Sequence, residues 1–199
     1  MKRFYLSVLF LCSFGSLFAG GPSFAFCDYS QGKVFIQENG EIVWEHKAPD
    51  SNDIWVLPNK NILFTAGKEV LEVSRKNDTI FHYTSESNIF ACQRLKNGNT
   101  FIGECDNGRL LEVSPDGSIV KDVSILPFGV KTGGHAFMRN ARCLDNGHYL
   151  VAHYGGKSVV EYDENGKAVW NIPVPGGAHS VIRLPSGNTL VAVTDKDNN

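Results

Sequence analysis

LKNGNTFIGE, residues 95–104, is one of four ten-residue segments that align along the chain without gaps. The other three are LPNKNILFTA from Leu57, LDNGHYLVAH from Leu144 and LPSGNTLVAV from Leu184. Their first leucines are separated by 38, 49 and 40 residues. A period of roughly 20 to 50 residues is the sequence signature of a repeat architecture. We therefore expect the fold to be built from one recurring unit.

A second segment recurs between these copies. It reads VLEVSRKNDTIFHY from Val70, LLEVSPDGSIVKDV from Leu110 and VVEYDENGKAVWNI from Val159, with a diverged copy, VFIQENGEIVWEH, from Val34. One position of the three full copies is always glutamate, namely Glu72, Glu112 and Glu161. The expected turn carries a glycine at Gly40, Gly117 and Gly166. Each repeat therefore contains two segments of related design.

Both segments have the chemistry of β-hairpins. A run of β-branched and aromatic residues borders Asn-Gly, Ser-Gly or Asp-Gly, whose glycine supplies the positive φ of a tight turn. Two hairpins in about 40 residues make four antiparallel strands, which is typical of a β-propeller blade. We predict an all-β fold, a β-propeller built of four-stranded antiparallel blades. A two-sheet sandwich would not require the repeat, and a solenoid of parallel strands would not need a hairpin at each step.

The repeats also define the domain organisation. The propeller region covers residues 26–199, with a half blade at 33–46, blades at 52–83, 90–123 and 138–172, and a half blade at 179–194. This is about four blades' worth of chain. The two half blades could pair and close a four-bladed ring, or the chain could be an arc truncated from a larger propeller. An open arc would expose strand edges and blade faces, through which oligomers could form.

Composition excludes several classes of function. The 199 residues are 42% hydrophobic and 20% charged, as in a folded globular protein. The 19 Lys+Arg and 21 Asp+Glu give a formal net charge of -2, which excludes a strongly basic nucleic-acid surface and argues against a polybasic membrane patch. From this charge we expect no nucleic-acid partner. The chain contains no GxSxG, P-loop or GxGxxG motif, and we expect no cofactor.

The N-terminus has the pattern of a secretory signal peptide. Lys2 and Arg3 precede a nearly continuous apolar run over residues 4–18, and small residues follow it. This run is short for a membrane span, which needs about 20 residues. We expect residues 1–25 to be a signal peptide cleaved after Ala19 or Ala25, and the mature protein to be periplasmic or extracellular without a membrane anchor. An uncleaved anchor helix is the alternative.

The cysteines do not form a recognised motif. Cys12 would leave with the signal peptide, and the spacings of Cys27, Cys92, Cys105 and Cys143 match neither a zinc site nor a CxxC pair. We expect them to be small buried hydrophobic residues. One disulfide, between Cys92 and Cys105, is the alternative for an exported protein.

The repeated motif also resembles a known superfamily. LPxGNTLVA followed by LEVxxDGxIVW is similar to the quinoprotein-like (PQQ-like) and NHL/WD40-like β-propellers, and more narrowly to exported bacterial propeller proteins of uncertain role. The resemblance rests on DYSQGKVFI from Asp28, ACQRLKNGNTFIGE from Ala91, GGHAFMRNARCL from Gly133 and PGGAHSVIRLPSGNTL from Pro175. It covers Asp28 to the end and implies propellers of six to eight blades. The tryptophan-docking pattern of PQQ enzymes is absent, so no PQQ dehydrogenase is implied.

Polar residues that interrupt the repeat are the candidate site. The first strand of each blade lines the central channel, and these strands are expected to start at Asn52-Asp53, Phe90-Ala91, Arg139-Asn140 and His179-Ser180. The second strands end in Glu104 and His153 where other repeats have an alanine or a valine. The longest spacing contains His135, beside two glycines that suit a loop over a pocket. We therefore predict that one channel mouth is formed by Asp53, Glu104, His135, Arg139, Asn140, His153 and His179.

Two interpretations apply to these residues. Arginine suits the carboxylate or phosphate of a ligand, and histidine suits proton transfer or a metal. The chain has no HxH motif and no pair of histidines four residues apart, so we predict no metal site and assign no catalytic residue. In the structural alternative, His153 bonds to neighbouring backbone and Arg139 joins adjacent blades through an ion pair.

Three functions follow from these patterns. The favoured one is an exported ligand-binding or interaction scaffold for a carbohydrate or other small anionic ligand. The first alternative is a lyase or hydrolase that acts on an acidic sugar through the histidines of the channel mouth. The second is a truncated remnant of a larger propeller protein, which would be insoluble or partly unfolded.

Overall fold

The described part of the chain folds into seventeen β-strands. The computed structural model describes residues 21–127 and 133–194, and all its regular elements are strands. No helix in this part of the chain has the length and apolar character needed to cross a membrane. The predicted all-β class is confirmed.

The strands form five antiparallel sheets in chain order. The first two sheets contain β1 (Phe24–Asp28), β2 (Lys33–Glu38), β3 (Glu41–Lys47); and β4 (Ile54–Val56), β5 (Ile62–Ala66), β6 (Glu69–Val73), β7 (Thr79–Thr84). The next two contain β8 (Ile89–Arg94), β9 (Thr100–Glu104), β10 (Arg109–Val113), β11 (Ile119–Ser124); and β12 (Asn140–Cys143), β13 (Tyr149–His153), β14 (Ser158–Tyr162), β15 (Ala168–Pro173). The last contains β16 (Gly177–Arg183) and β17 (Thr189–Thr194).

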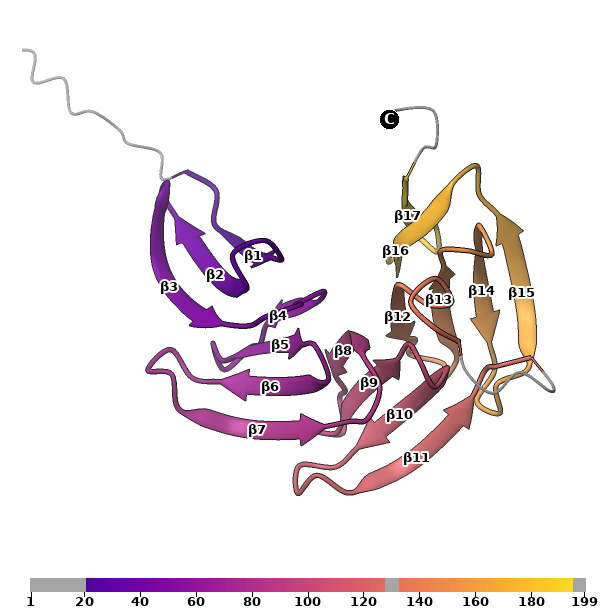
Figure 1. Cartoon of the computed structure of the whole chain (residues 1–199), viewed down its shortest axis with the longest axis horizontal. Helices are drawn as coiled ribbons and strands as arrows, with labels where there is room; N and C mark the ends of the chain where they lie inside the picture. Colours follow the sequence, from indigo (N-terminus) through magenta and orange to yellow (C-terminus); the bar gives the residue numbers. More distant parts are fainter. Residues whose placement is uncertain (1–20, 128–132, 195–199) are drawn as a thin grey trace, which may run out of the picture.

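The sheets fan out as the blades of a propeller. Each complete blade pairs its four strands in sequence order, with β4, β8 and β12 nearest the centre and β7, β11 and β15 on the outside (Figure 1). The strands of the three complete blades run from β4 to β7, from β8 to β11 and from β12 to β15. The predicted four-stranded antiparallel blade is confirmed.

The two ends of the arc do not close a ring. The first sheet has one strand more than the half blade expected at 33–46, because β1 pairs with β2, Phe24 opposite Gln37. The last sheet contains only β16 and β17, and the first and last sheets remain separate (Figure 1). Closure of a four-bladed ring by the two half blades is therefore wrong. The physical reason is that β1 and β17 both occupy the second-strand place of a blade, so the ends duplicate rather than complement each other.

The hydrophobic core lies between the blades. Four clusters of buried side chains fill the four blade interfaces, centred on Phe64, Ile102, Met138 and Val181. The second strands β5, β9 and β13 are buried along their whole length. This explains why these strands are apolar on both faces, since each sheet is covered by a neighbour on either side.

The turn and cysteine predictions can be compared directly with the backbone. Gly117 and Gly166 have φ of 88° and 82°, as expected for their hairpin turns. All four described cysteines are free thiols, so a disulfide between Cys92 and Cys105 is not formed. Cys92 and Cys105 are buried, as expected of small hydrophobic residues, whereas Cys27 and Cys143 are only half-buried. Residues 1–20, which hold most of the expected signal peptide, lie outside the described residues.

Candidate functional site

The propeller geometry gives the channel two mouths. We call the side where the innermost strands β4, β8, β12 and β16 begin the start mouth, and the side where they end the end mouth. Asn52, Phe90, Arg139 and His179 hold one repeat position at the start mouth. The turns after Leu57, Leu95, Leu144 and Leu184 border the end mouth.

Three predicted residues gather at the start mouth, and we call His135, Arg139 and His179 the histidine–arginine cluster. Nη1 of Arg139 lies 2.7 Å from Nε2 of His135, and its guanidinium lies 4.7 Å from the ring centroid of Phe90. The His179 ring is 4.9 Å from that of Tyr154. Both histidines of the cluster are exposed. Partial burial and the positive charge of Arg139 lower the pKa of His179, and His135 adds to this effect.

Arg139 differs from the other described arginines, because no carboxylate of residues 21–127 or 133–194 lies within 4 Å of it. The remaining five arginines all form ion pairs with acidic side chains, namely Arg75 with Glu38, Arg94 with Glu72, Arg109 with Glu104 and Asp122, Arg142 with Asp53, and Arg183 with Glu161. The ion pair between blades that was the structural alternative for Arg139 is therefore not formed within residues 21–127 and 133–194. Its charge faces the start mouth without a counter-charge from these residues.

His153 lies at the same mouth but is held inside its blade. It is buried, its Nδ1 donates to the carbonyl oxygen of Phe137 at 2.7 Å, and the Tyr162 hydroxyl lies 2.8 Å from its Nε2. A carbonyl can only accept, so the proton is on Nδ1 and Nε2 accepts from the tyrosine. Burial lowers the pKa of His153, which keeps the ring neutral. Both ring nitrogens are therefore used by the fold.

Glu104 is likewise occupied by neighbouring side chains. It is fully buried, and it accepts hydrogen bonds from Ser85 Oγ at 2.6 Å, Arg109 Nη1 at 3.1 Å and Asn107 Nδ2 at 3.2 Å. A buried carboxylate of this kind is stable only because its charge is paired and hydrogen-bonded. The geometry gives Glu104 a structural role at the base of its blade.

Asp53 and Asn140 hold the same repeat position, and both join innermost strands. Asp53 accepts the backbone N–H of Cys92 at 3.0 Å and two guanidinium N–H groups of Arg142 at 2.6 and 2.9 Å. In either orientation of its amide, Asn140 bonds the backbone of Val181 in β16. Both residues were predicted to be at the channel mouth, but their side chains bond neighbouring blades and are not free to bind a ligand.

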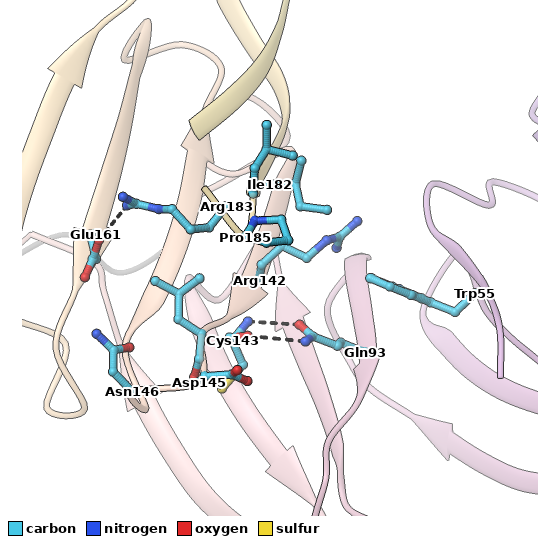
Figure 2. A pocket seen from close by; sticks show the side chains of 12 residues that line it. Trp55, Gln93, Arg142, Cys143, Asp145, Asn146, Glu161, Ile182, Arg183 and Pro185 are labelled. Carbon is cyan, nitrogen blue, oxygen red and sulfur yellow. Dashed lines mark hydrogen bonds and ion pairs between the residues drawn. The ribbon is translucent and has the colours of Figure 1, made fainter. Parts of the chain in front are cut away.

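A cavity of about 590 Å³ opens at the end mouth, and Figure 2 shows side chains that line it. Trp55, Gln93, Arg142 and Ile182 line it, and all four lie two residues before a repeating leucine. None of them was a sequence candidate. The alignment held a partial signal, because this channel position carries four unrelated side chains two residues before a leucine that repeats.

Comparisons with known proteins agree with the fold. No protein-family model and no curated protein matches the chain. Among solved structures, a protein of unknown function from Bacteroides caccae is 22% identical with a TM-score of 0.76, over 86% of this chain and 65% of that one. Virginiamycin B lyase from Staphylococcus aureus is 12% identical with a TM-score of 0.65, over 86% and 59%. BamB from Moraxella catarrhalis is 14% identical with a TM-score of 0.53, over 76% and 46%.

These likenesses establish the architecture. They show that the chain has a β-propeller fold, so the propeller architecture expected from the repeats is confirmed. The chain spans 65% or less of the length of each of these solved structures.

Proposed function

We propose that this protein is a ligand-binding β-propeller whose start mouth holds the carboxylate of a small anionic ligand, such as an acidic sugar. The observation that carries this proposal is Arg139, the one arginine of the described residues without an acidic partner, placed beside two exposed histidines. A carboxylate at this position would supply the missing counter-charge.

The geometry around Arg139 favours a planar anion. The guanidinium lies over the Phe90 ring, and its Nη1 is 2.7 Å from Nε2 of His135, so one face and one Nη atom are restrained before a ligand arrives. A restrained guanidinium loses little side-chain entropy on binding and presents parallel N–H groups that match the two oxygens of a carboxylate. His135 and His179 can add N–H donors at the same mouth.

The proposal can be tested with a pair of fluorescent glycosides. We expect 4-methylumbelliferyl glucuronide to bind more tightly than the corresponding glucoside, because only the glucuronide carries a carboxylate. The variant Arg139→Gln should weaken glucuronide binding by about tenfold or more, as expected for a lost charge-assisted hydrogen bond. The matched control is Arg75→Gln, which removes a surface arginine that is 3.6 Å from Glu38. Equal effects of the two substitutions on the glucuronide would contradict the proposal.

Binding of the anion should also depend on pH. The pKa of His179 is lowered in the free protein, and a nearby carboxylate would raise it. Binding would then take up protons, so the affinity should increase as the pH falls from 8 toward 6, the range in which histidine titrates, at about 6.5. Titrations of glucuronide at several pH values check this, and the pH dependence should be smaller in His179→Gln.

Catalysis at the same mouth is a second candidate function. An unprotonated imidazole beside an arginine can remove a proton from a carbon next to a carboxylate. One similar solved structure is described as a catalytically inactive histidine-to-alanine variant of virginiamycin B lyase with quinupristin, at 14% identity. In an acidic sugar linked through O4, His179 would take the proton from C5, the C4–O4 bond would break, and the leaving oxygen would take a proton from water. For this chain, formation of the unsaturated uronate from a 4-linked glucuronate oligosaccharide, followed by its ultraviolet absorbance, would favour catalysis, with a loss of about 100-fold in His179→Gln. Saturable binding without bond cleavage favours the scaffold.

Export is part of the proposed function. The pattern of residues 1–25 supports a cleaved signal peptide, and β1 bears on the position of the cut. Cleavage after Ala25 would remove the first two residues of β1, whereas cleavage after Ala19 leaves this strand whole. We therefore expect the secreted protein to begin at Gly20, which N-terminal sequencing of the fractionated protein can determine. A full-length chain in the cytoplasmic fraction would contradict export.

A further inference from the structure

The channel position shared by Trp55, Gln93, Arg142 and Ile182 carries one aromatic, one amide, one cationic and one aliphatic side chain. By contrast, the leucine position that follows and the glutamate position of the second hairpin reuse one residue type. Four different side chains at equivalent places around one channel are what recognition of an asymmetric molecule requires. All four line the cavity at the end mouth (Figure 2).

Two of these side chains are fixed by the fold. The indole N–H of Trp55 donates to the carbonyl of Cys92 at 2.6 Å, and the guanidinium of Arg142 lies 5.0 Å from the indole centroid. Asp53 holds that guanidinium through both of its Nη atoms. The side chains of Trp55 and Arg142 are therefore ordered before any ligand binds, which lowers the entropic cost of binding.

The charges that line the cavity are already paired. Arg142 is neutralised by Asp53, and Arg183 donates to Glu161 at 2.8 Å. Asp145 lies 2.9 Å from Lys96. The end mouth thus differs from the start mouth, where Arg139 has no acidic partner among the described residues. An ionic ligand would have to compete with these pairs, so an uncharged ligand suits this cavity better.

The two walls of the cavity differ in polarity. Ile182, Leu184 and Pro185, from β16 and the turn after it, form an apolar wall, and Ile182 is 40% exposed. Asp145 and Asn146, from the turn after β12, bring carboxylate and amide groups to the opposite wall (Figure 2). Side chains of this kind accept and donate hydrogen bonds to hydroxyl groups. The volume of about 590 Å³ is within the usual range for small-molecule sites.

We propose that the end mouth is a second binding site, which takes an uncharged amphipathic molecule with a flat apolar ring and a hydroxyl-bearing part. The apolar ring packs against Ile182 and Pro185, and the hydroxyl groups bond Asp145 and Asn146. An aryl glycoside of a neutral sugar has this chemistry. The site is separate from the proposed anion site, because it lies at the other end of the channel and uses none of its residues.

The test uses 4-methylumbelliferyl β-glucoside, a neutral probe, with the full-length mature protein and fluorescence anisotropy as the readout. We expect saturable binding that Ile182→Asp weakens by about tenfold or more, because a charge is placed on the apolar wall. The control is Ile119→Asp, since Ile119 is 45% exposed on the outer strand β11 and lies outside the cavity. Asp145→Ala should weaken binding by several-fold through the lost hydroxyl contacts.

The outcomes distinguish this site from the anion site. Arg139→Gln should leave glucoside binding unchanged, whereas Ile182→Asp should leave the preference for glucuronide over glucoside at the start mouth intact. Absence of saturable glucoside binding, or equal affinity in Ile182→Asp and Ile119→Asp, would overturn the proposal. Either result would leave the anion site standing, because that site is tested by its dependence on Arg139.

Discussion

Gly117 and Gly166 occupy the same turn position in two blades, but their surroundings differ. Both have positive φ, a conformation that strains a β-branched residue by roughly 1–2 kcal/mol. A Cβ on Gly117 would meet no atom within 4 Å. A Cβ on Gly166 would lie 2.6 Å from the backbone oxygen of Ser124 in the preceding blade. The second turn is therefore restricted by backbone conformation and by close packing together.

This difference makes a matched pair of substitutions informative. We predict that Gly117→Val lowers the free energy of unfolding by roughly 1–2 kcal/mol, from strain alone. Gly166→Val should lower it by more, because Ser124 or the turn must move. Urea denaturation of the two variants measures both values. Equal costs would show that the turn at Gly166 does not pack against β11.

His153 makes the free energy of unfolding depend on pH. Burial lowers the pKa of His153 in the folded state, while the unfolded chain has the ordinary value near 6.5. The unfolded state therefore binds more protons below this pH, and the free energy of unfolding falls as the pH decreases from about 6.5. We predict that His153→Gln reduces this loss between pH 6.5 and 5, as followed by urea denaturation.

The control for this prediction is a histidine that lies outside the core. His82 is exposed on β7, and His82→Gln should leave the acid-dependent loss of stability close to that of the unmodified protein. If His153→Gln and His82→Gln have the same pH profile, the buried imidazole is not the group responsible.

At the scale of the elements, two junctions between blades have an arginine–glutamate ion pair that a third junction lacks. Nη2 of Arg94 in β8 lies 2.6 Å from Oε2 of Glu72 in β6. Nη2 of Arg183 in β16 lies 2.8 Å from Oε2 of Glu161 in β14. The equivalent glutamate of β10 is Glu112, and the residue of β12 that matches these arginines is Cys143. The β10–β12 junction therefore has a thiol where its neighbours have a cation.

Replacing that thiol with arginine should create the corresponding ion pair with Glu112. We predict that Cys143→Arg raises the free energy of unfolding by roughly 0.5–1 kcal/mol, the range of a partly exposed ion pair. The variant would keep both hydrogen bonds of Gln93 to β12, because Gln93 bonds the backbone N–H and carbonyl of residue Cys143 and not its side chain. Thermal denaturation at low and high salt measures the gain, which should shrink in high salt.

A neutral substitution at the same position is the control. Cys143→Gln has a long polar side chain without the charge, so it should give little of the stabilisation. A gain of the same size from both variants would mean that the added side chain packs well and that Glu112 is not its partner.

At the scale of the whole molecule, the last sheet exposes a strand whose equivalents in the complete blades are buried. The second strands β5, β9 and β13 are buried throughout, whereas most of β17 is exposed, with Leu190 at 59% and Val193 at 37%. In the described sheet β17 has only β16 as a neighbour. An exposed apolar strand at a sheet edge is a ready surface for association.

We therefore predict that the purified protein self-associates through this sheet. Light scattering should give a mass above 21.9 kDa that increases with protein concentration. Leu190→Lys should lower the measured mass by placing a charge on β17, while Val120→Lys should not, since Val120 is 56% exposed on the outer strand β11. A concentration-independent monomer would contradict the prediction.

The sequence by itself determined the blade. The Asn-Gly and Asp-Gly turns, the β-branched runs beside them and the period of about 40 residues act within a single hairpin or repeat, where the backbone pairs with its near neighbours. These local constraints predicted the hairpins, the positive φ at Gly117 and Gly166, and the three complete blades. The repeat alignment also predicted that Arg139 and His179 lie at one mouth, since equivalent positions in a propeller lie at the same end, and the longest spacing predicted His135 on a loop beside them.

Only the tertiary structure decided which polar residues are available to a ligand. Arg142 pairs with Asp53, 89 residues away, and His153 is held by Phe137 and Tyr162, so these partners depend on how the blades pack. The same packing leaves Arg139 without a carboxylate among the described residues and brings Trp55 and Ile182 to one cavity. The physical reason is that a hairpin is specified by adjacent residues, whereas hydrogen bonds and ion pairs between blades join residues that no local pattern relates.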